Sequence, residues 1–175
     1  QIMAVKDHIK SLKDSLKRSK LDAYIIPSSD PHQSEYVADH WKSREWISGF
    51  TGSAGIAVVT STHAGLWTDS RYFLQAETEL KSSGMVLHKQ NTQGEPEHVD
   101  WLKNELNSGA TVAFDGKCFS ISQVESMKSS FLQKGIQIDG DTDLVSGNWK
   151  NRLALPSGKF YELSEYYTGM SRLDR

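Results

Sequence analysis

Apolar residues near the start of the chain recur at intervals of three and four, a spacing typical of an amphipathic helix with one buried face. The residues that carry this pattern are Val5, Ile9, Leu12 and Leu16. Residues 10–20 hold four Lys and one Arg together with Asp14, so we interpret this run as the solvated face of the helix. A short apolar run at 22–26, closed by Pro27, predicts that a buried strand follows.

The segment from 27 to 55 has no clear period. Asp30 before Pro31 has the pattern of a helix cap with proline in the first turn, and it predicts a short helix through Tyr36 and Val37. Residues 41–55 are rich in aromatic residues and glycine, so we expect an irregular loop or a helical turn there.

Two apolar runs at 56–60 and 64–68 are separated by three residues and predict a β-hairpin. Helical and strand patterns then alternate. We expect helices at 70–80, 99–106 and 120–133 and strands at 85–89, 111–114 and 136–138. This alternation favours an α/β fold in which helices flank a sheet, and the hairpin makes that sheet mixed rather than purely parallel.

The regular pattern ends near Leu155, where Pro156, Ser157 and Gly158 break any helix or strand. The following residues include several tyrosines but show no periodic core pattern. We therefore expect one domain at 1–155 and, at 156–175, a linker that starts the next domain.

Composition limits the possible classes of protein. A chain of 175 residues with 37% hydrophobic and 24% charged residues can form one domain with a core. The net charge of −2 argues against a nucleic-acid partner. The single cysteine, Cys118, excludes an internal disulfide and fits a reducing compartment. The apolar run of about 20 residues that a membrane span requires is absent, so we expect a cytoplasmic protein without a membrane partner.

Few residues have the spacing of a catalytic or metal site. The six histidines are scattered, and the local group of Asp30, His32 and His40 fits a capping residue with surface histidines better than a metal site. Cys118 beside Lys117 has no histidine near it in sequence and is interpreted as a bystander. The glycines at 52–55 match neither a nucleophile elbow nor a phosphate loop, so we expect a sharp turn or a close backbone approach there.

Arg71 is the most suggestive residue. A strand ends at Trp67, and Asp69 or Ser70 then caps a helix whose first turn holds Arg71. An arginine there opposes the helix dipole, which indicates that it serves a carboxylate or a chain terminus. A structural salt bridge from Arg71 to Asp69 or Glu45 is the alternative.

Three blocks of sequence resemble the cytosolic-type aminopeptidase P family. They are DAYIIPSSDPHQSEY at 22–36, REWISGFTGSAG at 44–55 and LWTDSRYFLQA at 66–76. A weaker fourth block, DLVSGNWKNR at 143–152, is followed by Pro156. The resemblance implies the creatinase/prolidase N-terminal fold, similar in layout to ribonuclease H. Arg71 matches the arginine of the family's Thr-Asp-Gly-Arg-Tyr motif, which is associated with substrate binding, and Ser70 replaces the glycine of that motif.

In this family a separate C-terminal catalytic domain holds two metal ions, usually manganese. The resemblance therefore implies a parent enzyme that releases the N-terminal residue preceding proline, with no catalytic residue, metal ligand or cofactor of its own in this domain. Its expected partners are peptides with proline in the second position, its own catalytic domain and further copies of itself in a homo-oligomer. The alternatives are a binding module of a metal-free, histone-chaperone type protein, or a prolidase or creatinase relative.

Overall fold

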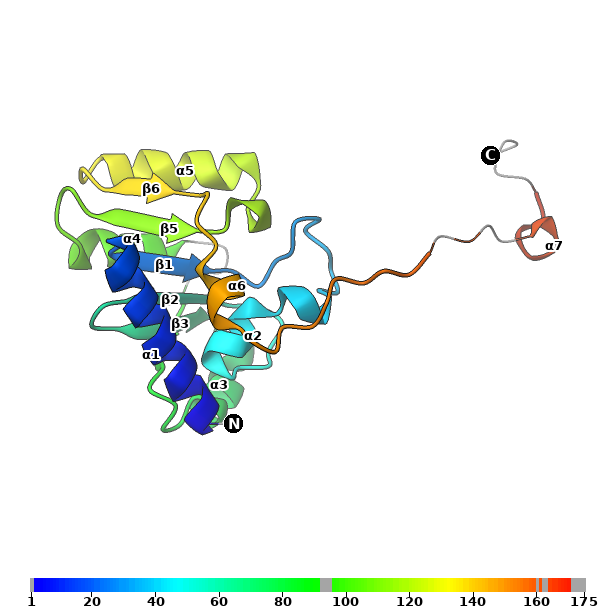
Figure 1. The fold of residues 1–175 in the computed structure, drawn as a ribbon, viewed down its shortest axis with the longest axis horizontal. Coiled ribbons are helices and arrows are strands. Elements are labelled where there is room, and N and C mark those ends of the chain that lie inside the picture. Colours follow the sequence, from blue (N-terminus) through cyan, green and yellow to red (C-terminus); the bar gives the residue numbers. More distant parts are fainter. Residues whose placement is uncertain (1, 92–95, 160, 162–163, 171–175) are drawn as a thin grey trace.

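The chain forms a six-stranded β-sheet with helices on both faces (Figure 1). The computed structural model describes residues 2–91, 96–159, 161 and 164–170. The strands are β1 (Ala23–Ile26), β2 (Ile56–Thr60), β3 (Ala64–Thr68), β4 (Val86–Lys89), β5 (Thr111–Phe114) and β6 (Gln137–Asp139). The α-helices are α1 (Ile2–Ser19), α2 (Ser43–Ser48), α3 (Phe73–Glu79), α4 (Glu97–Glu105), α5 (Ile121–Leu132), α6 (Leu144–Asn148) and α7 (Glu165–Thr168). The short 3-10 helices are η1 (Asp39–Trp41), η2 (Ser70–Tyr72) and η3 (Gly116–Cys118).

Among the described strands, five run in one direction and β2 runs against them. The strand order is β4-β3-β2-β1-β5-β6, with β2 antiparallel to both of its neighbours and every other pair parallel. The predicted mixed α/β sheet is therefore confirmed. The predicted hairpin is confirmed as well, since Val59 pairs with Ala64 across the turn between β2 and β3.

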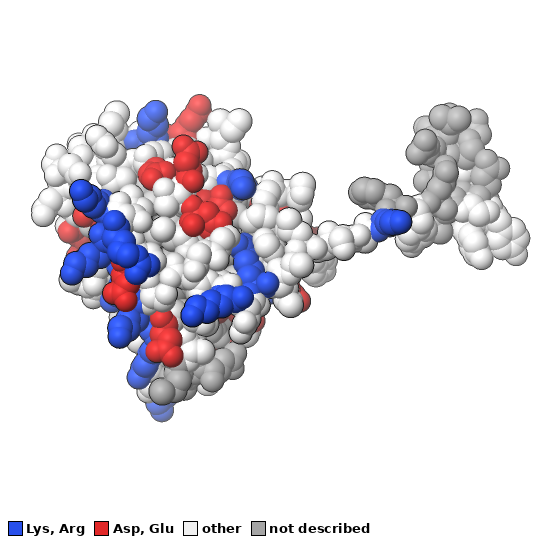
Figure 2. Space-filling view, in the orientation of Figure 1, with Lys and Arg blue, Asp and Glu red and all other residues white. Residues whose placement is uncertain are grey.

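Each face of the sheet has its own apolar core, because side chains alternate along every strand. Tyr24 and Ile26 of β1 point into a core shared with α1, α2, α3 and α6. Ala23 and Ile25 point into the opposite core, which α4 and α5 cover. The helical spacing in α1 has the predicted consequence: Val5, Ile9, Leu12 and Leu16 are all buried. Lys and Arg side chains with interspersed Asp cover the outer face of α1 (Figure 2).

One local prediction was wrong and one helix was missed. Residues 31–37 form turns instead of a helix, because the Asp30 carboxylate accepts the N–H groups of His32 and Ser34 and Gln33 has a φ of 54°, which a helix does not allow. Helix α6 was not predicted. Its signal is Asp143, whose side chain caps the helix by accepting the N–H groups of Val145 and Ser146.

Trp149 still packs against the core and Arg152 donates to the His40 carbonyl, and after Leu153 the chain leaves the sheet and its helices. Residues 153–159 have no helix or strand and are exposed, and α7 lies away from the body of the fold (Figure 1). Tyr161, Tyr166 and Tyr167 are between 75% and 88% exposed there, and the rings of Tyr166 and Tyr167 contact each other edge to face at a centroid distance of 5.2 Å.

Candidate functional site

Five strands end at one edge of the sheet, because β1, β3, β4, β5 and β6 run in the same direction. In Figure 1 the arrowheads of β1, β5 and β6 point to the side from which the C-terminal tail departs. Open α/β sheets bind ligands beyond the carboxyl ends of their strands. This edge is therefore the first place to look for a site, and Asp69, Arg71 and Gln90 all lie there, just after β3 and β4.

Asp69 and Arg71 form a bidentate ion pair at this edge. The Arg71 Nε and Nη2 atoms donate to the two carboxylate oxygens of Asp69 at 2.9 and 2.7 Å. The Asp69 carboxylate also caps η2 by accepting the backbone N–H of Arg71 at 3.1 Å. Hydrogen bonding from the Arg71 side chain holds the pKa of Asp69 below its usual value, so the pair is fully ionised at neutral pH.

This geometry decides between the partners considered for Arg71. The arginine pairs with Asp69 and not with Glu45, and the cap is Asp69 rather than Ser70. Ser70 replaces a glycine of the family motif without backbone strain, since its φ is not positive. The Arg71 side chain remains 58% exposed, while that of Asp69 is 14% exposed. Asp69 therefore anchors the guanidinium without covering it.

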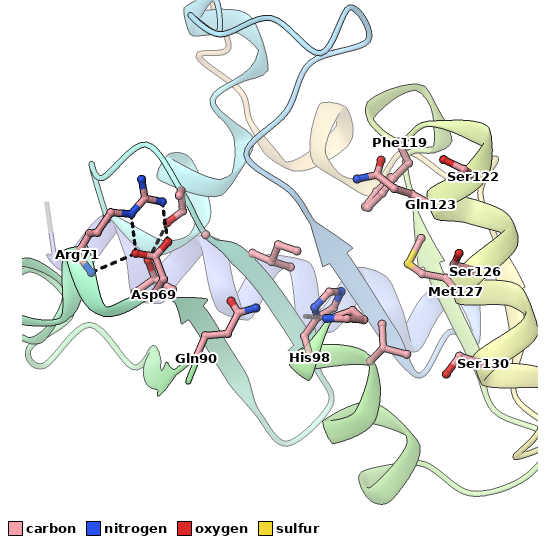
Figure 3. Close-up of a pocket in the computed structure, with 16 residues that line it drawn as sticks. Asp69, Arg71, Gln90, His98, Phe119, Ser122, Gln123, Ser126, Met127 and Ser130 are labelled. Carbon is pink, nitrogen blue, oxygen red and sulfur yellow. Dashed lines mark hydrogen bonds and ion pairs between the residues drawn. The ribbon is translucent and has the colours of Figure 1, made fainter. Parts of the chain in front are cut away.

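The pair lies at the mouth of a groove with a volume of about 530 Å³. Figure 3 shows Asp69 and Arg71 on one side, the face of α5 on the other, and His98 between them. Hydroxyls of α5 project along the groove at helical spacing from Ser122, Ser126 and Ser130. The floor is apolar, formed by Ile56, Val99 and Met127 among others. The volume is within the range of roughly 300–1,000 Å³ that small-molecule sites occupy.

His98 lies deep in this groove and is 5% exposed. Its Nε2 atom has no hydrogen-bond partner among the described residues. Burial lowers the pKa of His98 to about 4, so the imidazole is neutral at pH 7.

The aromatic and glycine-rich segment at 41–55 is organised by a buried arginine. Arg44 is 6% exposed and donates to Ser28 Oγ at 2.9 Å, to the Phe50 carbonyl at 2.8 Å and to the Gly52 carbonyl. Its guanidinium also lies 4.9 Å from the centre of the Phe50 ring. Burial lowers the pKa of Arg44 to about 10, so the group stays charged at neutral pH.

This segment is pinned against the turn that carries Arg71. A Cβ atom on Gly52 would lie 2.3 Å from Phe50 Cζ and 2.8 Å from Tyr72 Cδ1, so the predicted close approach is real at this glycine. Ser53 Oγ and the Tyr72 hydroxyl are 2.7 Å apart and hydrogen-bonded. The pattern of apolar residues does not predict that Arg44 is buried and organises this segment. The signal that the sequence does contain is a single arginine inside an aromatic run that ends in glycines.

The other candidates from the sequence do not come together. The Asp30 carboxylate binds local backbone N–H groups, while His40 Nδ1 lies 2.6 Å from the Leu153 carbonyl oxygen. Among the described residues, no group of three or more His, Cys, Asp or Glu side chains could hold a metal ion. Cys118 is buried, which raises its pKa to about 12 and leaves a protonated, unreactive thiol. None of the described helices is long and apolar enough to cross a bilayer.

The fold and its edge define a class of protein: a helix-flanked mixed α/β domain with a ligand-sized groove at the carboxyl ends of its strands. A family model, the Creatinase/Prolidase N-terminal domain, matches residues 8–145. The chain belongs to this family.

Sequence relatives point to one branch of the family. The chain is 39% identical over 176 residues to Xaa-Pro aminopeptidase 1 of Dictyostelium discoideum, covering 95% of this chain and 28% of the relative. It is 40% identical over 153 residues to Aminopeptidase P2 of Arabidopsis thaliana, a match that covers 86% of this chain and 21% of the plant protein. The human Xaa-Pro aminopeptidase 2 is 40% identical over 161 residues, a match that covers 91% of this chain and 23% of the human protein. The chain thus spans less than a third of the length of these relatives.

Solved structures agree. A crystal structure of X-prolyl aminopeptidase from Caenorhabditis elegans, described as a cytosolic enzyme with a di-nuclear active site, superposes with a TM-score of 0.83 at 32% identity. That match covers 97% of this chain and 29% of the worm protein. The N-terminal domain of the peptidase PepQ from Mycobacterium tuberculosis superposes with a TM-score of 0.57 at 20% identity. That match covers 75% of this chain and 90% of the PepQ domain and supports the fold alone.

Proposed function

We propose that this chain is the first domain of a metal-dependent Xaa-Pro aminopeptidase, which releases the N-terminal residue of peptides with proline in the second position. The observation that carries the proposal is the identity of about 40% along most of the chain to relatives named for this activity. In this proposal the domain ends near residue 155, and residues 156–175 lead to a catalytic domain. The match to only a fraction of each relative supports that arrangement.

The metals belong to that second domain. The worm relative is described as having a di-nuclear active site, whereas no group of three or more His, Cys, Asp or Glu side chains among the described residues here is arranged to hold a metal ion. We assign the two ions as manganese and the protein as cytoplasmic; the worm relative is described as cytosolic. The isolated domain is then expected to be inactive toward peptides.

The role proposed for this domain is to form one wall of the substrate cleft. Arg71 has five N–H donors, and its pairing with Asp69 uses two of them on the side chain. The remaining donors face outward from a turn that Asp69 holds in place. Because the ion pair has no net charge, Arg71 suits a peptide carbonyl as well as a carboxylate. We propose that it positions the substrate peptide over the metal site.

The deciding assay uses the full-length gene product with Mn²⁺ and a short peptide whose second residue is proline. Release of the first residue is expected, together with a lack of release from a matched peptide with alanine in the second position. Cleavage of Xaa-Pro dipeptides alone would favour a prolidase, and turnover of creatine a creatinase.

A protein without metal and without turnover would instead be a binding module of the histone-chaperone type. The mass of the intact protein in solution tests a further part of the proposal, namely that subunits associate as a homo-oligomer.

A further inference from the structure

Two histidines meet on the face of the sheet that α4 covers, away from Arg71. His63 lies in the turn between β2 and β3, and His88 lies on the neighbouring edge strand β4. Their Nε2 atoms are 2.9 Å apart and hydrogen-bonded, so one neutral ring donates from Nε2 and the other accepts. Both residues are only partly buried. Neither residue takes part in the Arg71 site or in the three blocks shared with the aminopeptidase family.

Aromatic rings hold both imidazoles in place. The His88 ring stacks on Trp67, with centroids 3.9 Å apart and planes within 6° of parallel. The His63 ring packs against Trp101 of α4 at a centroid distance of 4.7 Å. Fixed rings lose little rotational freedom when they bind an ion, which favours binding.

A glycine near the start of β3, Gly65, makes the approach possible. A Cβ atom on Gly65 would lie 2.9 Å from His88 Cδ2, 3.0 Å from His63 Nε2 and 2.7 Å from the Trp67 ring. Glycine weakens a strand interior and often marks a place where another group comes close. Here the groups that come close are the Trp67 ring and the two imidazoles.

We propose that His63 and His88 form a bidentate site for a divalent late transition-metal ion, bound through both Nε2 atoms with water in the other positions. Metal–nitrogen bonds of about 2.05 Å at a right angle place two nitrogens about 2.9 Å apart, and a tetrahedral angle places them about 3.3 Å apart. The observed separation therefore suits the right angles of Ni²⁺ or Cu²⁺ directly, and Zn²⁺ after a small opening of the pair. Binding through both Nε2 atoms replaces the hydrogen bond between the rings, and the proton of the donor ring moves from Nε2 to Nδ1.

The surroundings keep the pair ready to bind at neutral pH. Burial lowers the pKa of His88 to about 4, with a further contribution from His63, and burial also lowers the pKa of His63. Both rings are therefore neutral, so neither has to lose a net positive charge before it binds a metal ion. Two charged groups act on His63 in opposite directions: Lys13 disfavours a positive charge there and Glu105 favours it.

The test is calorimetric titration of the full chain with Ni²⁺ and with Zn²⁺ at pH 7.5, with Mg²⁺ as the oxygen-preferring control ion. One ion of nickel or zinc is expected to bind per chain and to raise the melting temperature, whereas Mg²⁺ does neither. His63→Gln and His88→Gln each keep a hydrogen-bonding side chain but remove a ligand, and each is expected to weaken binding at least tenfold. The matched control His32→Gln removes an exposed histidine elsewhere and should leave the affinity unchanged.

Gly65→Ala provides a second, independent variant. Its methyl group is expected to push the rings apart and weaken Ni²⁺ binding while both histidines remain. Melting curves without metal show whether each variant is folded, and binding is compared only among folded variants. Nickel binding that persists in the His63→Gln/His88→Gln double variant, or that falls equally with His32→Gln, would overturn the proposal, as would a wild-type chain that binds neither ion.

Discussion

Replacing Arg44 by alanine is the sharpest test of how the site is built. The guanidinium is buried and is shared by three acceptors: the Ser28 hydroxyl and the carbonyls of Phe50 and Gly52. It has no ion-pair partner among the described residues, so its positive charge is stabilised by these oxygens and by the Phe50 ring. Alanine leaves two buried carbonyls without a donor and a cavity where the side chain was.

The magnitude follows from these contacts. A hydrogen bond that involves a charged group contributes about 1.5–3 kcal/mol, and a buried acceptor left unpaired costs about 1–3 kcal/mol. These contributions are not additive, and removing a buried charge recovers part of its desolvation cost. We therefore expect Arg44→Ala to lower the free energy of unfolding by about 3–5 kcal/mol, because two buried carbonyls lose their charged donor and a cavity is left. For a chain of this size that is a fall in melting temperature of about 10 °C.

The assay is urea unfolding of the 175-residue chain, followed by circular dichroism at a fixed pH. Arg44→Lys keeps the charge but not the planar fork of donors, so its loss is expected to be smaller than that of alanine. Arg71→Ala is the matched control, because it removes an arginine from an exposed position. A loss below about 1 kcal/mol for Arg44→Ala, less than a single charged hydrogen bond contributes, would refute the reasoning.

Three further predictions concern the same edge. In the full-length enzyme, Arg71→Ala should lower kcat/KM with little change in melting temperature. A lower melting temperature with unchanged kcat/KM would show that Arg71 is a structural residue. Gly52→Ala should lower the melting temperature, because its Cβ meets the buried Phe50 ring, whereas Gly158→Ala, with open space around it, should not. The neutral His98 contributes stability above its unfolded pKa near 6.5 that is lost as pH falls toward its folded pKa of about 4. Between pH 7 and pH 5 this loss should reach about 2 kcal/mol in urea unfolding, and it should shrink in His98→Gln if His98 is the group responsible.

Most of the sheet could be predicted because its signals are local. Strand β5 has the bounds that the apolar run predicts, and β2 and β3 do as well. Errors arose where backbone polar groups decided the structure. At Asp30 the same carboxylate that can cap a helix closes a turn instead, and the outcome depends on the φ of Gln33, which no spacing of apolar residues encodes.

The candidate site was predictable only in part. The sequence around Arg71 predicted that this arginine binds a carboxylate. Asp69, its partner in the structure, was one of two salt-bridge partners considered, with Glu45. The groove beside it could not be predicted, because it requires α5 to lie opposite a turn that precedes it by about fifty residues in the sequence. The place of His98 in this groove could not be predicted either, because its burial depends on the packing of α4 against the sheet.

The three blocks that resemble the aminopeptidase family converge in space. Ser28 of the first block donates to the Gly55 carbonyl and accepts from Arg44 of the second block. Arg44 in turn fixes the backbone at Gly52, against which Tyr72 of the third block packs. Tyr72 is the neighbour of Arg71, so the position of the exposed arginine depends on the buried one. The residues of these three blocks therefore form one support for the turn that carries Arg71.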